Sequence, residues 1–254
     1  MPAKKGKTTD RSVGNGRTEE KVMSNELKNV LLVVSGPSGS GKNTLLNYIL
    51  ENRPDSVHSV SATTRAPRFF EHDGVDYYFK TTAEFERLID EGGLIEWDKY
   101  RGNYYGTLVS DVQRKIDEGL NVVFDITIPG AENVKRLFPN ATKTVFVLPP
   151  SIRILRHRLV CRKSDDEETI NRRIEFAIRS EIEKYRDFDY VLVNDDLDEA
   201  RKNILAIYDS LTKPDCENTA AAACFKKDAF AEHAEETIKR IHEEVMNDSF
   251  QNNA

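Results

Sequence analysis

The residues best suited to chemistry lie in one glycine-rich stretch, VLLVVSGPSGSGKNT at positions 30–44. Its apolar start predicts a buried strand, and the spacing of Leu45, Leu46, Ile49 and Leu50 after it predicts a helix. A strand, a loop with the spacing G-x-x-x-x-G-K and a helix, in this order, are typical of a phosphate-binding loop. Backbone N–H groups, the helix N-terminus and a lysine ammonium would all face the phosphate oxygens. We expect the phosphates of a nucleotide to be bound by Gly36, Pro37, Ser38, Gly39, Ser40, Gly41, Lys42, Asn43 and Thr44.

One position of this loop departs from the pattern. The residue after Lys42 is normally Ser or Thr, whose hydroxyl ligates Mg²⁺, and here it is Asn43. An amide oxygen can also ligate magnesium, but its geometry and charge differ from those of a hydroxyl. Asn43 is therefore a candidate metal ligand that departs from the usual chemistry, while the loop itself still indicates a nucleotide site.

The composition limits the class of protein. The 254 residues are 39% hydrophobic and 31% charged, which is typical of a globular protein with one large or two small domains. No apolar run approaches the roughly 20 residues of a membrane span, so we expect no membrane contact. A net charge of −6 argues against general nucleic-acid binding. The polar N-terminus has no apolar signal region, and Cys161, Cys216 and Cys224 lack metal-ligand spacing, so we expect reduced thiols and a cytoplasmic location.

The middle of the chain alternates between apolar runs and helical patterns. This alternation predicts an α/β fold, with a parallel sheet flanked by helices and ligands at the carboxyl ends of its strands. The expected strands are 30–35, 57–61, 120–126, 144–148 and 189–193, and the expected helices are 42–52, 151–162, 168–186 and 196–212.

Three segments break this alternation. Residues 1–28 carry seven Lys or Arg against four Asp or Glu and few apolar residues, which predicts a disordered basic arm. Residues 62–107 predict a small inserted subdomain with one helix, about 82–91, capped by Thr81 or Thr82. Residues 213–254 predict a short linker at 215–224 and an amphipathic helix at 225–246. That helix, with Phe230, Ala234, Ile238, Ile241 and Val245 on one face, could pack on the core or on a second subunit as a dimer contact.

A pair of arginines forms a second candidate site. Arg65 and Arg68 flank a proline in Thr64-Arg65-Ala66-Pro67-Arg68, and planar guanidinium groups suit bidentate phosphate recognition. Tyrosines follow at 77 and 105, and their hydroxyls could complete a phosphate site without adding charge. Beside the phosphate-binding loop, this pair indicates a second phosphate group.

Together these motifs resemble guanylate kinase. The loop, the arginine pair, Glu96-Trp97, Asn103-Tyr-Tyr-Gly, Arg158-Leu-x-x-Arg162, Arg173 and Val193-Asn194-Asp195-Asp196 occur in the order and spacing of that family over about residues 29–212. The resemblance implies a nucleoside monophosphate kinase with a P-loop. Its core would be 29–61 and 108–212, its GMP-binding insert 62–107 and its lid about 158–173.

The resemblance also implies the roles of single residues in the reaction ATP + GMP ⇌ ADP + GDP with Mg²⁺, with dGMP as a further acceptor. Lys42 would contact the ATP phosphates, and Asn194 would lie near the adenine. The lid would supply Arg158, Arg162 and Arg173 to the transferring phosphoryl group. The GMP phosphate would be bound by Arg65, Arg68, Tyr77 and Tyr105. The guanine would be read by Ser61, Glu96 and Thr107, and Asp125 would be a further GMP-binding residue.

The chemistry of guanine agrees with two of these roles. A carboxylate such as Glu96 can accept hydrogen bonds from N1–H and N2–H₂ together, and a hydroxyl such as Thr107 can donate to O6. Adenine presents the opposite edge, so a site built on these hydrogen bonds would discriminate against it.

Three departures from the family pattern leave alternatives open. Asn43 replaces the metal-ligating hydroxyl, Thr127 replaces the second acid of an Asp-x-Asp pair that begins at Asp125, and Lys163 stands at a usual lid glycine. The chain could therefore be a weakened or non-catalytic guanylate-kinase-like module that binds a protein partner. A kinase for another small phosphorylated acceptor is a third reading.

Overall fold

The structure is a computed structural model that describes residues 29–100, 102–163, 165–213, 218–226 and 234–245. At its centre lies a five-stranded sheet in the order β2-β7-β1-β8-β9, in which every neighbouring pair is parallel. Strand β1 (Leu31–Ser35) is the middle strand and is buried along its whole length. A strand covered on both faces gains stability from every apolar side chain, which explains its continuous apolar run. The other four are β2 (Ser56–His58), β7 (Asn121–Asp125), β8 (Thr142–Leu148) and β9 (Tyr190–Val193).

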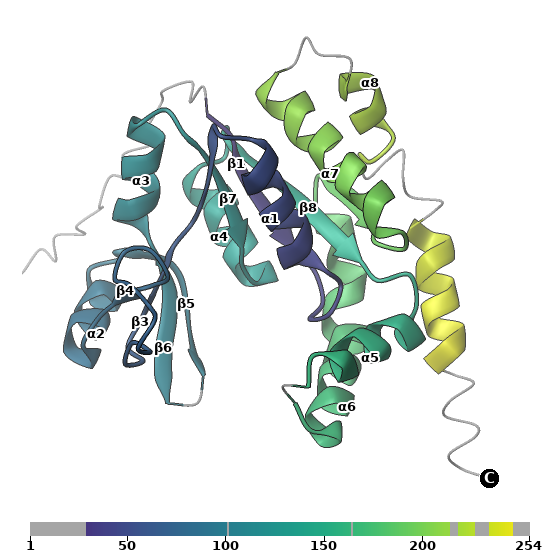
Figure 1. The fold of residues 1–254 in the computed structure, drawn as a ribbon, viewed down its shortest axis with the longest axis horizontal. Coiled ribbons are helices and arrows are strands. Elements are labelled where there is room, and N and C mark those ends of the chain that lie inside the picture. The colour runs from purple at the N-terminus through teal and green to yellow at the C-terminus, as the bar shows by residue number, and fades with distance from the viewer. Residues whose placement is uncertain (1–28, 101, 164, 214–217, 227–233, 246–254) are drawn as a thin grey trace, which may run out of the picture.

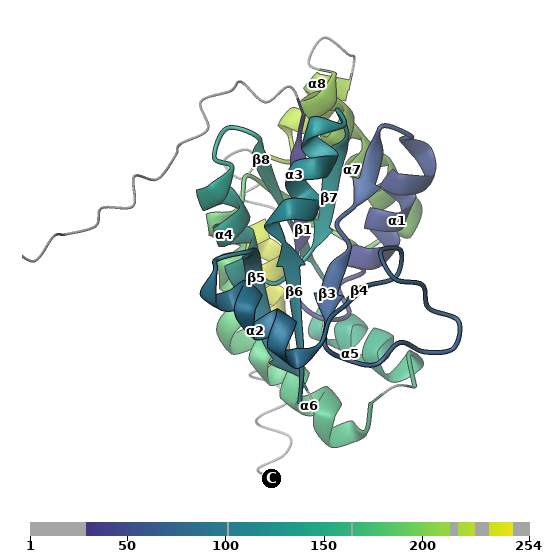
Figure 2. The same ribbon diagram turned by 90° about the vertical axis from the view of Figure 1, so that its left-hand side faces the viewer.

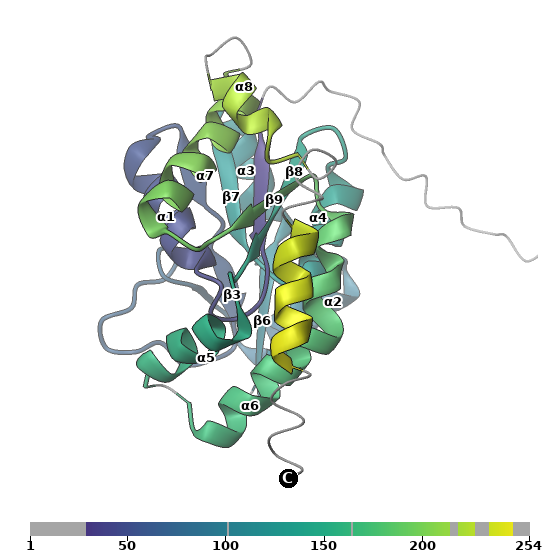
Figure 3. The same cartoon turned by 90° about the vertical axis from the view of Figure 1, so that its right-hand side faces the viewer.

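Helices cover both faces of this sheet (Figures 1 and 3). One apolar core lies under α1 (Lys42–Asn52), α7 (Leu197–Thr212) and α8 (Asn218–Ala223). The core on the other face is formed with α3 (Val109–Asp117), α4 (Ile128–Leu137), α5 (Ile152–Cys161) and α6 (Glu167–Phe176). The predicted α/β class with a parallel sheet is thus confirmed.

A second, four-stranded sheet stands beside the first, in the order β4-β3-β6-β5 (Figure 2). It contains β3 (Ser61–Thr63), β4 (Tyr78–Phe79), β5 (Leu94–Tyr100) and β6 (Asn103–Leu108), with α2 (Thr82–Asp90) packed on it through Phe85. Thr81 caps α2, because its hydroxyl accepts a hydrogen bond from Glu84 N while its own backbone N–H donates one to the Glu84 carboxylate. Ser61 and Leu108 belong to this sheet, so it extends one residue beyond the expected insert at each end.

The local structure differs from the sequence prediction at several points. The expected strand 57–61 is two strands, β2 and β3, in different sheets. The expected helix 168–186 is α6 followed by a π-helical turn, Ala177–Glu181, and a 3-10 helix, Ile182–Asp187. Helices α3 and α4 were not predicted, and the expected linker 215–224 contains α8.

The end of the described chain is helical at 234–245, and we call this segment the C-terminal helix. Ala234, Ile238 and Ile241 are buried in the chain's own core, with Val245 packed against it. The helix does not begin at 225 as expected, because Phe225 accepts a hydrogen bond from Val191 N at the sheet edge and Lys226 forms a bridge with Tyr190. Phe230 and the expected arm 1–28 lie outside the described residues. Within the described chain, we find no helix with the length and apolar character needed to span a bilayer.

Candidate active site

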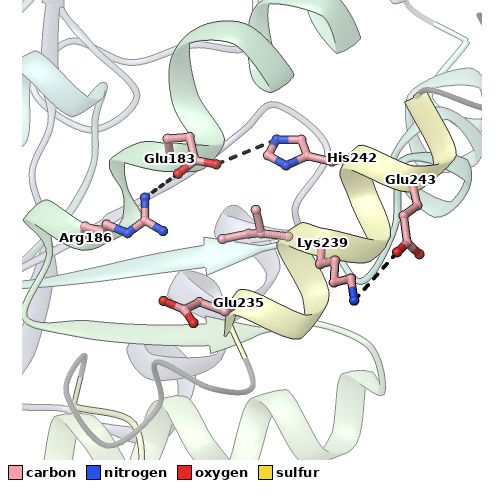
Figure 4. Close-up of a pocket in the computed structure, with 7 residues that line it drawn as sticks. Glu183, Arg186, Glu235, Lys239, His242 and Glu243 are labelled. Carbon is pink, nitrogen blue, oxygen red and sulfur yellow. Dashed lines mark hydrogen bonds and ion pairs between the residues drawn. The ribbon is translucent and has the colours of Figure 1, made fainter.

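Two hollows on the described surface differ sharply in what lines them. The larger, about 720 Å³, lies between the 3-10 helix Ile182–Asp187 and the C-terminal helix (Figure 4). Its charged side chains pair with one another, as Glu183 does with Arg186 and Lys239 with Glu243. The smaller, about 530 Å³, opens at the carboxyl ends of β1 and β7, where ligands of parallel sheets bind. We therefore assign the candidate site to the smaller cavity.

This smaller cavity brings together many of the residues expected from the sequence. The expected residues that line it are Gly36, Ser38, Gly39, Gly41, Lys42, Asn43, Ser61, Glu96, Tyr105, Asp125 and Arg162. Pro37, Ser40 and Thr44 of the loop do not line it, and Thr44 is exposed on α1. The loop, the second sheet and the segment after α5 thus meet at one place.

The loop requires glycine at two positions. Gly36 has a φ of 139°, and a Cβ there would lie 2.4 Å from the Val147 carbonyl oxygen. Gly41 has a φ of 100°, and its Cβ would lie 2.1 Å from Asn194 Nδ2. Any side chain at either position would therefore push the loop away from the sheet or from Asn194.

Lys42 is held at the base of the loop. Its ammonium donates hydrogen bonds to the carbonyl oxygens of Gly36 at 2.8 Å and Pro37 at 3.1 Å. Burial lowers the pKa of Lys42, while the charges of Asp125 and Glu181 act in the opposite direction. A partly desolvated ammonium interacts strongly with an incoming anion, which suits a phosphate contact.

All three expected lid arginines reach toward the loop. Arg158 donates to the carbonyl oxygens of Ser40 at 3.3 Å and Asn194 at 2.9 Å. Arg173 donates to the Ser38 hydroxyl at 3.1 Å and pairs with Asp165 at 3.2 Å, whereas Arg162 lines the cavity directly. Two of the three guanidinium groups thus contact the phosphate-binding loop, and the third lines the cavity that the loop opens into.

Asn194 joins this loop to the end of β9. Its side-chain amide is buried and donates to the Ser40 carbonyl oxygen at 2.7 Å. Within the described residues, its Oδ1 and the Ser40 hydroxyl are buried without a hydrogen-bond partner. Buried polar atoms normally have a hydrogen-bond partner. Asn194 Oδ1 could therefore accept a hydrogen bond from a bound molecule, and the Ser40 hydroxyl could donate or accept one.

The residues expected to read guanine lie on the second sheet. Thr107, fully buried on β6, donates its hydroxyl to Glu96 Oε1 at 2.8 Å across the strand pair β5–β6. Burial raises the pKa of Glu96, and the Thr107 hydrogen bond partly offsets this. Glu96 and Ser61 face the cavity from this sheet, and Asp125 faces it from the end of β7.

The arginine pair is organised by a carboxylate. Arg65 donates to both carboxylate oxygens of Glu71, at 2.8 and 3.0 Å, and its guanidinium lies 5.3 Å from the Tyr77 ring centre. Tyr77 and Tyr105 contact each other edge to face, with ring centres 6.2 Å apart. The side chain of Arg68 is 65% exposed, and it lies 3.9 Å from Glu71. Arg65, Tyr77 and Tyr105 thus form one group, and Arg68 is free to turn toward it.

The comparisons with known proteins agree on one family. The guanylate kinase family model matches residues 28–210, well over half of the chain. The chain belongs to the guanylate kinase family. It is 44% identical over 181 residues to the guanylate kinase of Synechocystis sp., a match that covers 71% of this chain and 94% of the relative. The guanylate kinase of Halalkalibacterium halodurans is 43% identical over 180 residues, which cover 71% of this chain and 87% of that relative.

A solved structure of the same family resembles the fold. It is the crystal structure of guanylate kinase from Anaplasma phagocytophilum, with a TM-score of 0.56 and 32% sequence identity. The match covers 74% of this chain and 90% of that one. The C-terminal helix, at 234–245, lies beyond the range of the guanylate kinase family model.

The three departures from the guanylate kinase pattern each have a place in the structure. Thr127 is the N-cap of α4, since its hydroxyl accepts a hydrogen bond from Gly130 N at 3.3 Å. Asn43 is exposed on the first turn of α1 and lines the cavity. Lys163 follows the end of α5 with a φ of 52°, a left-handed conformation that explains the usual glycine.

The structure also adds acidic residues that the sequence analysis missed. Asp98 lines the cavity two residues after Glu96, and the two-residue period of a strand could have identified it. Glu181 lines it from the π-helical turn, where burial raises its pKa and the charge of Lys42 lowers it. No sequence motif distinguishes Glu181 or Glu71. Each reaches its position through a turn of the folded chain, which the local sequence does not reveal.

Proposed function

We propose that this chain transfers the γ-phosphoryl group of ATP to GMP, which gives ADP and GDP. The observation that carries the proposal is the single cavity that Lys42, Arg162 and Glu96 share. A phosphate-binding lysine, an arginine of the expected lid and a carboxylate suited to guanine are the parts that a two-nucleotide site needs. Membership of the guanylate kinase family supports the same reaction.

The acceptor would be held from the second sheet. Glu96 would accept hydrogen bonds from guanine N1–H and N2–H₂, and Thr107, now donating to Glu96, would turn its hydroxyl toward O6. Ser61 would also contact the guanine, and Asp125 would be a further contact of the same nucleotide. The GMP phosphate would be bound by Arg65, Arg68, Tyr77 and Tyr105.

The donor would be held by the loop. Backbone N–H groups of the segment from Gly36 to Thr44 would contact the ATP phosphates, and Lys42 would exchange its carbonyl partners for phosphate oxygens. Asn194 would lie by the adenine, where its buried Oδ1 could accept a hydrogen bond.

Transfer itself would depend on positioning and on neutralisation of charge. The γ-phosphoryl group would leave the β–γ bridging oxygen of ATP and bond to a phosphate oxygen of GMP, with Arg158, Arg162 and Arg173 supplying positive charge. Their positions on and after α5 would also exclude water, which would otherwise accept the phosphoryl group.

The donor set fits a divalent cation of the kind that kinases with a P-loop use. Asn43, Asp125 and Thr127 all line the cavity and offer oxygen atoms, which Mg²⁺ prefers. Mg²⁺ is commonly bound through one or two protein groups together with substrate phosphates, so Asn43 would supply one ligand. When bound, the ion would neutralise phosphate charge.

Two other readings of the sequence receive less support. A non-catalytic module would draw on Asn43 and Thr127, but both still offer oxygen atoms to a cavity that retains Lys42 and Arg162. In a kinase for AMP, the Glu96 carboxylate would face adenine N1, which is a hydrogen-bond acceptor like the carboxylate itself. A cytoplasmic location, dGMP as a second acceptor and a dimer through the C-terminal helix stay predictions.

A coupled assay for ADP tests the proposal. Purified protein is given ATP, Mg²⁺ and one acceptor at a time, namely GMP, dGMP, AMP or a sugar phosphate, beside a Lys42→Ala variant. We expect turnover with GMP that the variant loses by roughly a hundredfold or more. Turnover no higher than that of Lys42→Ala would refute the enzyme, and preference for AMP would refute the roles of Glu96 and Thr107.

A further inference from the structure

The C-terminal helix contacts the start of α5, the helix that carries Arg158 and ends just before Arg162. Glu244 Oε2 accepts hydrogen bonds from the backbone N–H groups of Ile152, at 2.8 Å, and Arg153, at 3.2 Å. These are the first two residues of α5. We infer that Glu244 is a positioning residue for phosphoryl transfer, acting through α5 on Arg158 and Arg162, an inference that rests on the proposed function.

This contact completes the cap of α5. The Ser151 hydroxyl accepts from Ile154 N at 3.1 Å, and Leu155 N donates to the Ser151 carbonyl oxygen. Glu244 accepts from the N–H groups of Ile152 and Arg153, so each of the first four N–H groups of the helix has an acceptor. A carboxylate at this end also interacts favourably with the partial positive charge of the helix N-terminus.

The orientation of α5 matters because the helix touches the phosphate-binding loop. Leu155 and Leu159 are buried on its inner face, and a Cβ at Gly39 would lie only 2.9 Å from Leu155 Cδ1. From the same helix, Arg158 donates to the carbonyl oxygens of Ser40 and Asn194. A small rotation at the N-terminus of α5 would therefore move an arginine relative to the loop.

The C-terminal helix has a second contact beyond the other end of the lid, on the 3-10 helix Ile182–Asp187. His242 Nε2 lies 3.6 Å from Glu183 Oε1, on the 3-10 helix Ile182–Asp187 that directly follows Glu181 of the cavity (Figure 4). The buried side chains of Ala234, Ile238 and Ile241 fix the C-terminal helix to the core. It thus contacts both ends of 152–187, the segment that carries all three lid arginines.

The test compares Glu244→Ala with a matched control, Glu243→Ala. Glu243 precedes it on the same helix, is exposed, and contacts Lys239 at 4.0 Å within that helix. We expect kcat to fall about three- to tenfold in Glu244→Ala, with the KM for GMP unchanged. Glu244→Gln should recover part of the loss, since its amide oxygen can accept the same hydrogen bonds without the charge. Glu243→Ala should match the wild type.

Hydrogen exchange of peptides from α5 supplies a readout that needs no turnover. Exchange at 152–156 should quicken in Glu244→Ala and not in Glu243→Ala, while the melting temperature and exchange in the central sheet show whether the fold is intact. Unchanged exchange in α5, or unchanged kcat with faster exchange, would overturn the inference. An equal loss of kcat in Glu244→Ala and Glu243→Ala would also overturn it. So would a rise in the KM for GMP in Glu244→Ala as large as its fall in kcat.

The failure of the proposed function would look different. Wild-type protein that makes no ADP from ATP and GMP refutes the activity whatever Glu244 does. The affinity for ADP, measured by calorimetry, then decides the inference together with exchange. If Glu244 positions α5, ADP should bind about threefold more weakly to Glu244→Ala, because Arg158 of this helix contacts the loop. Equal affinity of Glu244→Ala and Glu243→Ala for ADP would overturn the inference.

Discussion

Glu71 holds the guanidinium of Arg65 with both oxygens of its carboxylate, at 2.8 and 3.0 Å. The same carboxylate accepts a hydrogen bond from Arg68 N at 2.8 Å, so it also fixes the turn between the two arginines. Arg65 lowers the pKa of Glu71, as expected for a carboxylate paired with a permanent cation. Glu71 therefore holds the guanidinium of Arg65 and the backbone that carries Arg68.

The first prediction concerns this pair. Glu71→Gln should raise the KM for GMP about five- to twentyfold and change kcat little, because an arginine that is no longer oriented binds the phosphate less well. Steady-state kinetics with GMP varied at saturating ATP measures this. Glu86→Gln, an exposed substitution on α2, is the control. A lower KM would mean that the carboxylate competes with the phosphate for Arg65.

The second prediction concerns the pH dependence of guanine recognition. Burial raises the pKa of Glu96, and the negative charge of Asp98 raises it further. GMP needs the ionised carboxylate, so kcat/KM for GMP should fall as the pH drops through this raised pKa. Asp98→Asn should move the acid limb of the profile to lower pH, because it removes a like charge. A limb that stays in place in Asp98→Asn would contradict this account.

Glu96→Gln tests the same residue without titration. The amide can no longer accept from both guanine donors, so kcat/KM for GMP should fall by about a hundredfold or more, and the acid limb should disappear. The ratio of GMP to AMP turnover measures the loss of specificity. If that ratio is unchanged, another group reads the base.

The sequence predicted the parts of the site that consist of short motifs. The loop from Gly36 to Lys42 has a fixed spacing because its backbone must wrap around phosphate, and that spacing is visible in the chain alone. Helix α4 was missed because Pro129-Gly130 has the composition of a turn. In the structure the proline lies in the first helical turn after Thr127, where its missing N–H costs nothing.

The remaining part of the site depends on how distant segments meet. Glu71 reaches the arginines through a loop, and Glu181 faces Lys42 only because α6 continues into a π-helical turn. Nothing in the local sequence specifies either geometry. Glu244 is a further case, since its partners Ile152 and Arg153 lie more than ninety positions earlier in the chain, at separations of 92 and 91.

The third prediction concerns the metal. If Asn43 is a direct ligand, Asn43→Ser should lower the Mg²⁺ concentration needed for half-maximal activity and leave the KM for GMP unchanged, because the hydroxyl is the usual ligand at this position. A magnesium titration of the ADP assay measures both. An unchanged titration midpoint and unchanged maximal activity would show that Asn43 is a neutral variant.

The fourth prediction concerns Lys163. Its φ of 52° is unfavourable for a side chain, and Lys163 N donates to the Val160 carbonyl oxygen in the turn that ends α5. Lys163→Gly should raise the free energy of unfolding by about 0.5–1 kcal/mol, since relief of this conformation exceeds the entropy that glycine gains when unfolded. Urea unfolding measures it. Lys163→Ala, which keeps the Cβ, should give no gain, and an equal gain there would assign the effect to the lost charge.

The last prediction concerns the junction of the two sheets. Asp111 on α3 is buried and accepts hydrogen bonds from Tyr78 of β4 at 2.6 Å and from Lys115 and Arg114 of its own helix. Burial alone would raise the pKa of Asp111, but these hydrogen bonds outweigh it and lower the pKa. Because the pKa is lower when folded, the stabilisation is present above the unfolded pKa and is lost as pH falls through the folded one.

Asp111→Asn should therefore lower the free energy of unfolding by roughly 3 kcal/mol at neutral pH, because it leaves the buried Lys115 ammonium without its carboxylate. The difference from wild type should be smaller at acid pH than at neutral pH, because the native aspartate gains its proton as the pH falls through a folded pKa that lies below the unfolded value of about 3.9. Urea unfolding at both pH values measures this. Glu118→Gln removes an exposed partner of Arg114 and should cost less than about 1 kcal/mol. A cost that is the same at both pH values would mean that Asp111 acts through its shape rather than its charge.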